Sequence, residues 1–248
     1  MRNPQRGVLV LALALGGLLG AEAADLRDGT VTLGGVTVAL PAPVGFRPLT
    51  TETAVTKAMS PDGPRRLATF YSDSDLDRAL RGQKDGAALA FNRWYMASVS
   101  RELENVRATL REFQEFKEEY RGQQVQLITQ LEPRLRDFNK RVSTNMSADF
   151  DTSITANIGE PVPLGIVSED SRSISSALLM QVSVSEDGQT RANTVVGVTS
   201  VVFVKGKLLF LYTYSTLQSP KDLEWAKQAA QEWVAQVTGA NRPKSGSN

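Results

Sequence analysis

The chain has 248 residues, 41% of them hydrophobic and 22% charged, a composition typical of a globular protein and too apolar for a disordered one. It contains no histidine and no cysteine, which excludes disulfide bonds, zinc and haem sites built on these residues, and Ser-His-Asp or Cys-His nucleophiles. Any metal would need oxygen ligands, and any catalysis would need Asp, Glu, Lys or Tyr side chains with shifted pKa values.

Residues 1–23 have the pattern of a secretory signal peptide. Arg2 and Arg6 form a positive start, an apolar run over 8–19 follows, and small residues occupy the two positions that a signal peptidase reads. The apolar run of about 12 residues is shorter than the roughly 20 that a helix needs to span a bilayer. We therefore expect cleavage after Ala23 and a periplasmic or secreted mature protein.

The charge of the expected mature chain is balanced. Removing residues 1–23 takes away Arg2, Arg6 and Glu22, so the 28 basic and 27 acidic residues of the whole chain fall to 26 of each. A nucleic-acid binder normally shows a basic excess, so we expect no nucleic-acid partner. No later stretch is long and apolar enough to predict a membrane span.

Short strands and turns are expected in the first hundred residues. Apolar residues alternate on either side of Gly34-Gly35, which predicts a two-residue hairpin. Two further segments rich in β-branched and aromatic residues predict strands. The expected elements are strands at 30–33, 36–40, 66–71 and 91–100, and short helices at 51–59 and at 75–80, the last capped by Ser74.

A long central helix is expected next. Thr109 and Glu112 form a capping box, and apolar residues recur at spacings of three, four and seven over 110–142. Pro133 lies within this stretch and lacks an amide donor, so we expect a kink or break just before it, or two helices in sequence. Residues 143–159 are polar and aperiodic, which predicts a loop.

The last third of the chain predicts strands followed by one helix. The strands are expected at 162–167, 172–185, 194–204 and 208–216, the helix from a cap at Ser219 to a stop at Gly239, and a disordered tail at 242–248. Strands 194–204 and 208–216 are apolar on both faces and must be covered on both sides. Strand 172–185 alternates apolar residues with serines, which predicts a half-solvated strand near an edge.

These elements predict an α+β fold with a single domain over 24–241. The chain has only two long amphipathic segments, the central one at about 110–142 and the C-terminal one. We expect each helix to cover one face of a mostly antiparallel sheet.

Carboxylates suggest no metal or catalytic site. Asp73 and Asp75 alternate like the start of a calcium loop, but the glycine and glutamate that such a loop requires are missing, so they are expected to favour the start of a short helix. Glutamates at 112, 115, 118 and 119 alternate with Arg111, Lys117 and Arg121, which predicts a solvated helix face. We predict no catalytic residue, no metal and no cofactor.

Trp94 and Tyr95 are the candidate binding-surface residues. They are adjacent on an expected strand and therefore point to opposite faces. One is expected to pack in the core and the other to line a groove, although ordinary packing explains both.

Parts of the chain resemble a known fold. The hairpin leads into Leu40-Pro41 and Gly45-Phe46, and much later come the strands VVGVTSVVFVKGKLLFLYTYS and the helix DLEWAKQAAQEWV. This layout is similar to uncharacterised secreted proteins of proteobacteria and resembles the PsbP-like α/β/α sandwich. The resemblance implies an antiparallel sheet flanked by helices and a role in binding or assembly.

The leading functional hypothesis is an exported, non-catalytic binding or assembly module with a protein partner at the cell envelope. Two alternatives remain: a histidine-free hydrolase that uses Asp and Glu carboxylates, and a structural envelope protein that forms homo-oligomers through its central helix.

Overall fold

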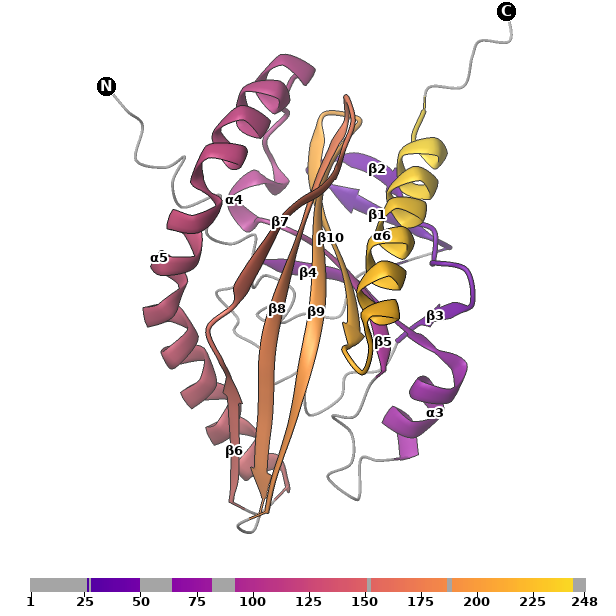
Figure 1. Ribbon diagram of the computed structural model, residues 1–248. Coiled ribbons are helices and arrows are strands. Elements are labelled where there is room, and N and C mark those ends of the chain that lie inside the picture. The colour runs from indigo at the N-terminus through magenta and orange to yellow at the C-terminus, as the bar shows by residue number, and fades with distance from the viewer. Residues whose placement is uncertain are drawn as a thin grey trace, which may run out of the picture.

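A curved antiparallel sheet forms the centre of the protein (Figure 1). The computed structural model describes residues 26, 28–49, 64–81, 92–150, 153–186 and 189–242. In sheet order the strands are β3 (Phe46–Pro48), β4 (Arg65–Ser72), β5 (Arg93–Val99), β10 (Lys207–Thr216), β9 (Gln189–Val204), β8 (Ser173–Glu186) and β6 (Ile154–Ile158), with β7 (Val162–Glu169) also paired to β8. The helices are α3 (Asp73–Arg81), α4 (Arg101–Glu104), α5 (Leu110–Phe150) and α6 (Pro220–Ala240). The predicted α+β class is confirmed.

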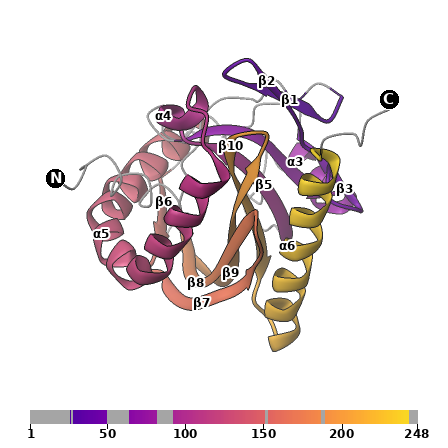
Figure 2. The same ribbon diagram turned by 90° about the horizontal axis from the view of Figure 1, so that it is seen from above.

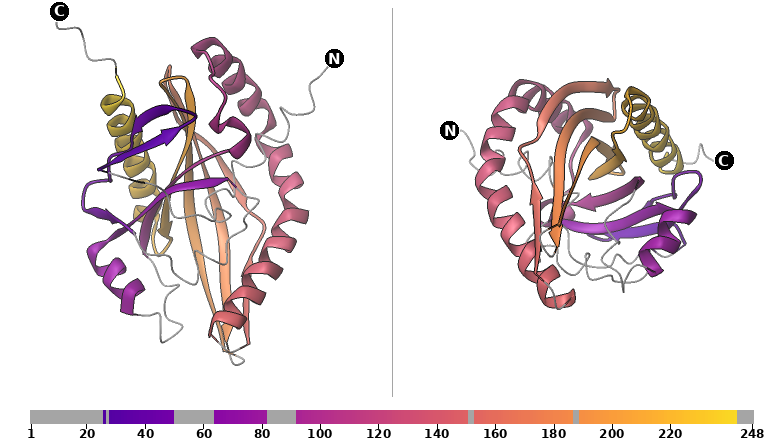
Figure 3. Two further views of the ribbon diagram at one scale, coloured as in Figure 1. Left: turned by 180° about the vertical axis from the view of Figure 1, so that it is seen from behind. Right: turned by 60° about the horizontal axis from the view of Figure 1, so that its bottom comes forward.

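The predicted N-terminal hairpin is present as a small sheet of its own. Strands β1 (Thr30–Leu33) and β2 (Val36–Ala39) pair antiparallel, with Leu33 opposite Val36. Gly34 and Gly35 both have positive φ, at 48° and 76°, as a two-residue turn that matches the strand twist requires. The hairpin lies beside α6 (Figure 3) and contributes to the core on that side of the sheet.

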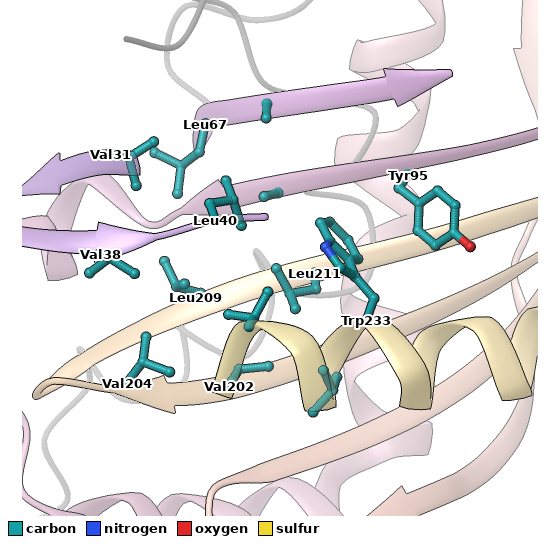
Figure 4. Packing of buried hydrophobic residues seen from close by; sticks show 14 of the residues in the cluster. Val31, Val38, Leu40, Leu67, Tyr95, Val202, Val204, Leu209, Leu211 and Trp233 are labelled. Atoms are coloured by element: carbon teal, nitrogen blue, oxygen red, sulfur yellow. The ribbon is translucent and has the colours of Figure 1, made fainter. Parts of the chain in front are cut away.

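Two long helices cover opposite faces of the sheet, as the two-sided apolar strands require (Figure 2). On one face Phe113 of α5 stacks on Phe203 of β9, with ring centroids 5.7 Å apart. On the other face Val202 of β9 packs in one cluster with Trp233 of α6 (Figure 4). The prediction that the central and C-terminal helices each cover one face is therefore confirmed.

Helix α5 is longer than its sequence pattern indicates. Its predicted capping box is present, since the Thr109 amide donates to Glu112 Oε2 at 2.7 Å and the Glu112 amide donates to Thr109 Oγ1 at 3.2 Å. The helix then runs for 41 residues through Pro133, so the predicted break and the alternative of two helices are wrong, while the kink at this position stays a prediction. Proline removes one amide hydrogen bond, whereas apolar side chains on both sides of it, such as Tyr120 and Leu135, are buried against the sheet.

The predicted loop at 143–159 is also wrong, because β6 lies within it and α5 covers the free edge of that strand. The Asn139 amide group accepts from the Ile158 N–H and donates to the Ile158 carbonyl, both at 3.0 Å. The Ser143 hydroxyl makes the same pair of bonds with Ala156, at 2.9 and 3.2 Å. Asn139 and Ser143, which are one helical turn apart, thus form hydrogen bonds with the backbone of two residues of β6. These bonds occupy edge groups that could otherwise pair with another strand.

Strand β8 is only partly solvated. It lies next to the edge strands β6 and β7, as predicted, but Ser173 and Ser175 are buried. Ser175 Oγ lies 2.8 Å from Ser200 Oγ on β9, and this hydrogen bond compensates for the burial of both hydroxyls. The prediction of a wetted serine face is therefore wrong for this half of the strand.

The caps of the other helices follow local chemistry. Ser219 and Asp222 form the predicted capping box of α6 with Pro220 at its start, but the helix passes Gly239 and ends at the cap Asn241. At α3 the cap is Ser72 instead of the predicted Ser74, because the Ser72 hydroxyl accepts from the Asp75 amide at 3.2 Å.

The expected signal peptide at 1–23, the helix at 51–59 and the tail beyond 242 lie outside the described residues.

Candidate functional site

One face of strands β4, β5 and β10 is largely buried and yet carries polar side chains. Strand register aligns three rows across it. The rows are Arg66, Ser98 and Phe210; Thr69, Met96 and Tyr212; and Tyr71, Trp94 and Tyr214. We call these nine residues the inner polar face. Eight are buried and Trp94 is half-buried, although polar residues are normally found at the surface.

The opposite face of the same strands is apolar. It carries Leu67, Ala97, Leu209 and Leu211, which pack with Trp233 of α6 (Figure 4). A bulge between Arg66 and Ala68 shifts the register of β4. As a result, Leu67 and Ala68 both pack on the α6 side. The next residue, Thr69, is paired with Met96 and lies on the inner polar face. The polarity difference thus belongs to the side of the sheet and is not a property of these strands as a whole.

Aromatic rings form a stack along the inner polar face. Trp94 stacks on Tyr214 with centroids 4.9 Å apart and planes 21° apart, and Tyr214 is parallel to Tyr212 at 6.2 Å. On β9 the residue opposite Tyr214 is Gly197. A Cβ atom at Gly197 would lie 2.9 Å from Tyr214 Cε1, so the position of this ring depends on the missing side chain.

The tyrosine hydroxyls on this side of the sheet differ in their hydrogen bonding. Tyr120 of α5 bonds to Ser176 at 2.5 Å, and Ser98 donates to the Tyr212 hydroxyl at 3.5 Å. The Tyr214 hydroxyl and Thr69 Oγ1, by contrast, are buried and have no hydrogen-bond partner among the residues that the structure describes. Such a group costs about 1–3 kcal/mol of stability.

Burial also determines the protonation of these tyrosines. It raises the pKa of Tyr212 and raises the pKa of Tyr214 well above its usual value. It raises the pKa of Tyr71 to about 12, with the Arg66 charge acting against the shift and the Asp75 charge adding to it. All three hydroxyls therefore keep their protons at physiological pH.

The two candidate residues from the sequence lie on different faces, as their adjacency requires. Trp94 belongs to the inner polar face, where it is half-buried. Tyr95 is buried on the α6 side, with its ring 4.7 Å from Phe46 and 5.2 Å from Trp233. Tyr95 is thus a core packing residue, and Trp94 is the one that lies at the candidate site.

The carboxylates of the α3 region have structural contacts. Asp73 is exposed and accepts from Arg47 Nε at 2.5 Å, while Asp75 is buried in the first turn of the helix. Across the described ranges no three carboxylates lie close enough together to hold a metal ion.

The charged stretch of α5 is not a fully solvated face, because Lys117 is buried. Lys117 Nζ lies 2.8 Å from Glu169 Oε1 and donates to the Asp170 carbonyl at 2.6 Å. Arg121 also pairs with Glu169, and these contacts attach α5 to the end of β7. Hydrogen bonds from Arg121 and then Lys117 lower the pKa of Glu169, against the effect of its burial.

We expect this contact to make the stability pH-dependent. A carboxylate with a lowered pKa stabilises the fold at pH values above its unfolded pKa, and this contribution is lost as the pH falls through the folded value. Glu169→Gln should therefore lower Tm by about 2–4 °C at pH 7, with a difference from the parent that shrinks below about pH 4. Calorimetry between pH 3 and 7 checks this. Glu118→Gln, which removes an exposed pair with Arg121, should change little.

Edge strand β7 carries a second candidate surface. Val162, Leu164 and Ile166 are 56%, 40% and 38% exposed, and they make up half of the exposed large hydrophobic residues in the described ranges. Val162 is paired with Leu179, which packs towards α6, and Ile166 with Ser176, which bonds to α5. Paired side chains point to the same side, so the exposed aliphatic residues extend around both sides of the edge.

Comparison of the chain with models of protein families and with curated proteins finds no match. In the described part of the chain, no helix combines the length and apolarity that a membrane crossing requires.

Proposed function

We propose that the chain is an exported, non-catalytic binding or assembly module whose partner is a protein of the cell envelope. The exposed aliphatic strand β7 supports this proposal best. Clustered exposed apolar side chains on an otherwise polar surface are typical of protein contacts, and Val162, Leu164 and Ile166 lie within five consecutive residues.

The backbone of β7 favours a partner that contacts side chains over one that extends the sheet. Pro163 lacks an amide donor, Gly165 has φ of 90°, and the pairing with β8 shifts register twice. Prolines and bulges of this kind protect edge strands from pairing with another strand. A second copy of this chain that adds its own β7 is therefore disfavoured, and an envelope protein with an apolar pocket is the expected occupant.

Site-specific photocrosslinking in cells that produce the full chain tests this proposal. A photoreactive residue at Leu164 should yield one discrete adduct, while the same residue at Val44, which is 83% exposed and lies outside β7, should not. Adding Val162→Ser and Ile166→Ser should abolish the adduct, and circular dichroism of the purified variant should remain unchanged.

Three outcomes would contradict the proposal. Repeated absence of an adduct would contradict the existence of a protein partner at this surface. An adduct that survives the two serine substitutions would contradict β7 as the contact surface. An adduct with the mass of two chains would favour the homo-oligomeric alternative, which light scattering on the purified protein would confirm.

The carboxylates give the hydrolase alternative less support than β7 gives the binding proposal. A glycosidase-type acid needs a carboxyl group with a raised pKa. Among the described residues, Glu169 and Asp222 are the carboxylates with a resolved shift, and both pKa values are lowered. Burial alone would raise the pKa of Asp222. Hydrogen bonds from the Gln218 and Ser219 amides, the Ser219 hydroxyl and Arg93 together lower this pKa by more.

A further inference from the structure

The outer edge of β6 is occupied by side chains of α5 instead of a further strand (Figure 1). Alternate residues of a strand direct their backbone groups to opposite neighbours, and β6 uses one set of these groups to pair with β8. The outward N–H and C=O of Ile158 are bound by the Asn139 side chain, and those of Ala156 are bound by the Ser143 hydroxyl. A neighbouring strand would bind the same groups, so α5 takes the place of a strand at this edge.

We propose that Asn139 and Ser143 guard a latent self-association edge. When the second half of α5 moves away, β6 of a second copy of this chain pairs antiparallel with β6 and joins the two sheets into one. This edge is separate from the exposed aliphatic side chains of β7, and the inference does not depend on a protein partner there.

Strand β6 has no protection of its own against pairing. Proteins protect sheet edges with prolines, bulges or charged residues, or cover them with a helix. The neighbouring edge strand β7 contains Pro163 and two shifts of register. Strand β6, by contrast, has the sequence Ile-Thr-Ala-Asn-Ile and pairs with β8 without a shift. Its protection therefore depends on the side chains of α5.

The sequence of β6 is compatible with pairing to a second copy of itself. In an antiparallel pair centred on Ala156, this residue lies opposite Ala156 of the second copy, and Ile158 lies opposite Ile154 of the second copy. No residue of β6 is charged, so two copies meet without the repulsion that like charges cause across a strand pair. Because both copies use the same edge, the contact closes at a two-fold dimer.

The two halves of α5 are held to the sheet in different ways. The first half carries the buried rings of Phe113 and Tyr120. Among the described side chains after Pro133, Leu135 is buried and Val142 is partly buried against the same cluster. Proline lacks the amide that would bond to the preceding turn, so the helix is weakened between the two halves. Loss of the hydrogen bonds to β6 therefore favours release of the second half.

Light scattering on the purified double variant Asn139→Ala, Ser143→Ala tests the inference. Alanine favours a helix more than asparagine or serine does, so the substitutions do not weaken α5 itself. The measured mass should be double that of the parent protein. The matched control is Lys140→Ala, Thr144→Ala, which changes the next residue in each case, and both of these residues are exposed. The control should keep the mass of the parent.

A proline in β6 identifies the surface that associates. The Ala156 amide donates to Ser143 in the structure and points away from β8, so Ala156→Pro removes an outward donor and leaves the pairing with β8 intact. Added to the double variant, Ala156→Pro should return the mass to that of the parent. Circular dichroism should show the same strand and helix content in all variants.

Amide hydrogen exchange tests the guard without requiring association. Asn139→Ala alone should speed exchange of the Ile158 amide, and Ser143→Ala alone should speed exchange of the Ala156 amide, because each amide loses its acceptor. Exchange resolved by NMR measures both, and the Lys140→Ala, Thr144→Ala control should leave both rates unchanged.

Four results would overturn the inference. They are a double variant that keeps the mass of the parent or forms assemblies of more than two chains, a control that also doubles in mass, a dimer that persists with Ala156→Pro, and parental exchange rates in the single variants. The β7 crosslink reports on a different surface, so the two proposals fail independently.

Discussion

Trp233→Ala is expected to destabilise the protein by about 3–5 kcal/mol, the range for removing a large buried aromatic side chain. Trp233 is fully buried between α6 and the sheet, where its ring meets Phe70 and Tyr95 edge-on, with centroids 5.7 and 5.2 Å away. Its indole N–H also donates to the Pro41 carbonyl at 2.9 Å. The substitution leaves a cavity and an unsatisfied carbonyl, and it loosens the link between α6 and the segment after the hairpin.

Urea unfolding of the purified protein measures this effect. Trp225→Ala is the matched control on the same helix, since Trp225 is half-buried and lies with its ring under Arg93, whose guanidinium carbon is 4.2 Å from the ring centroid. The control should cost clearly less than Trp233→Ala. Equal costs for the two substitutions would contradict the assignment of Trp233 as the main anchor of α6.

Gly34→Ala is expected to cost about 3 kcal/mol or more, which combines backbone strain with a steric clash. The residue has φ of 48°, and a Cβ atom there would lie 2.6 Å from the Glu104 carbonyl oxygen and 2.9 Å from Lys207 Nζ. Lys207 is buried and donates to the carbonyls of Glu104 and Val106 at 2.7 and 2.9 Å. The substitution therefore disturbs the contact between the hairpin and the end of α4.

The neighbouring glycine separates the two causes. Gly35 also has positive φ, at 76°, but nothing lies within 4 Å of a Cβ atom placed there. Gly35→Ala should therefore show only the backbone cost of about 1 kcal/mol. Urea unfolding measures the loss of unfolding free energy for each variant. If the two losses are equal, the steric clash of a side chain at position 34 with α4 and Lys207 adds nothing to the cost of Gly34→Ala.

The candidate sites were less accessible to sequence reasoning than the fold was. The alternation of Phe210, Tyr212 and Tyr214 along one strand was visible in the sequence as one half of a two-sided apolar strand. Their alignment with Thr69 and Trp94 depends on pairing between segments more than a hundred residues apart and on the bulge beside Arg66. Neither the register nor the bulge has a local sequence signal, so the polarity of this face could not be recognised.

Local chemistry by itself determined several elements of this protein: the N-terminal hairpin, the starts of α5 and α6, and the central strands. Glycines set the hairpin turn, capping boxes set the starts of α5 and α6, and apolar residues on both sides of β9 and β10 required a helix on each face. These signals span a few residues, and their meaning does not depend on distant partners.

Tertiary contacts decided the rest, because their free energy comes from groups that are distant in sequence. Burial of Lys117 follows from its partner Glu169, and the length of α5 follows from its side-chain bonds to β6. The buried hydroxyls of Thr69 and Tyr214 share a face only through the order of β4, β5 and β10 in the sheet. Pairing across the sheet thus brings polar and aromatic side chains from distant strands onto one buried face.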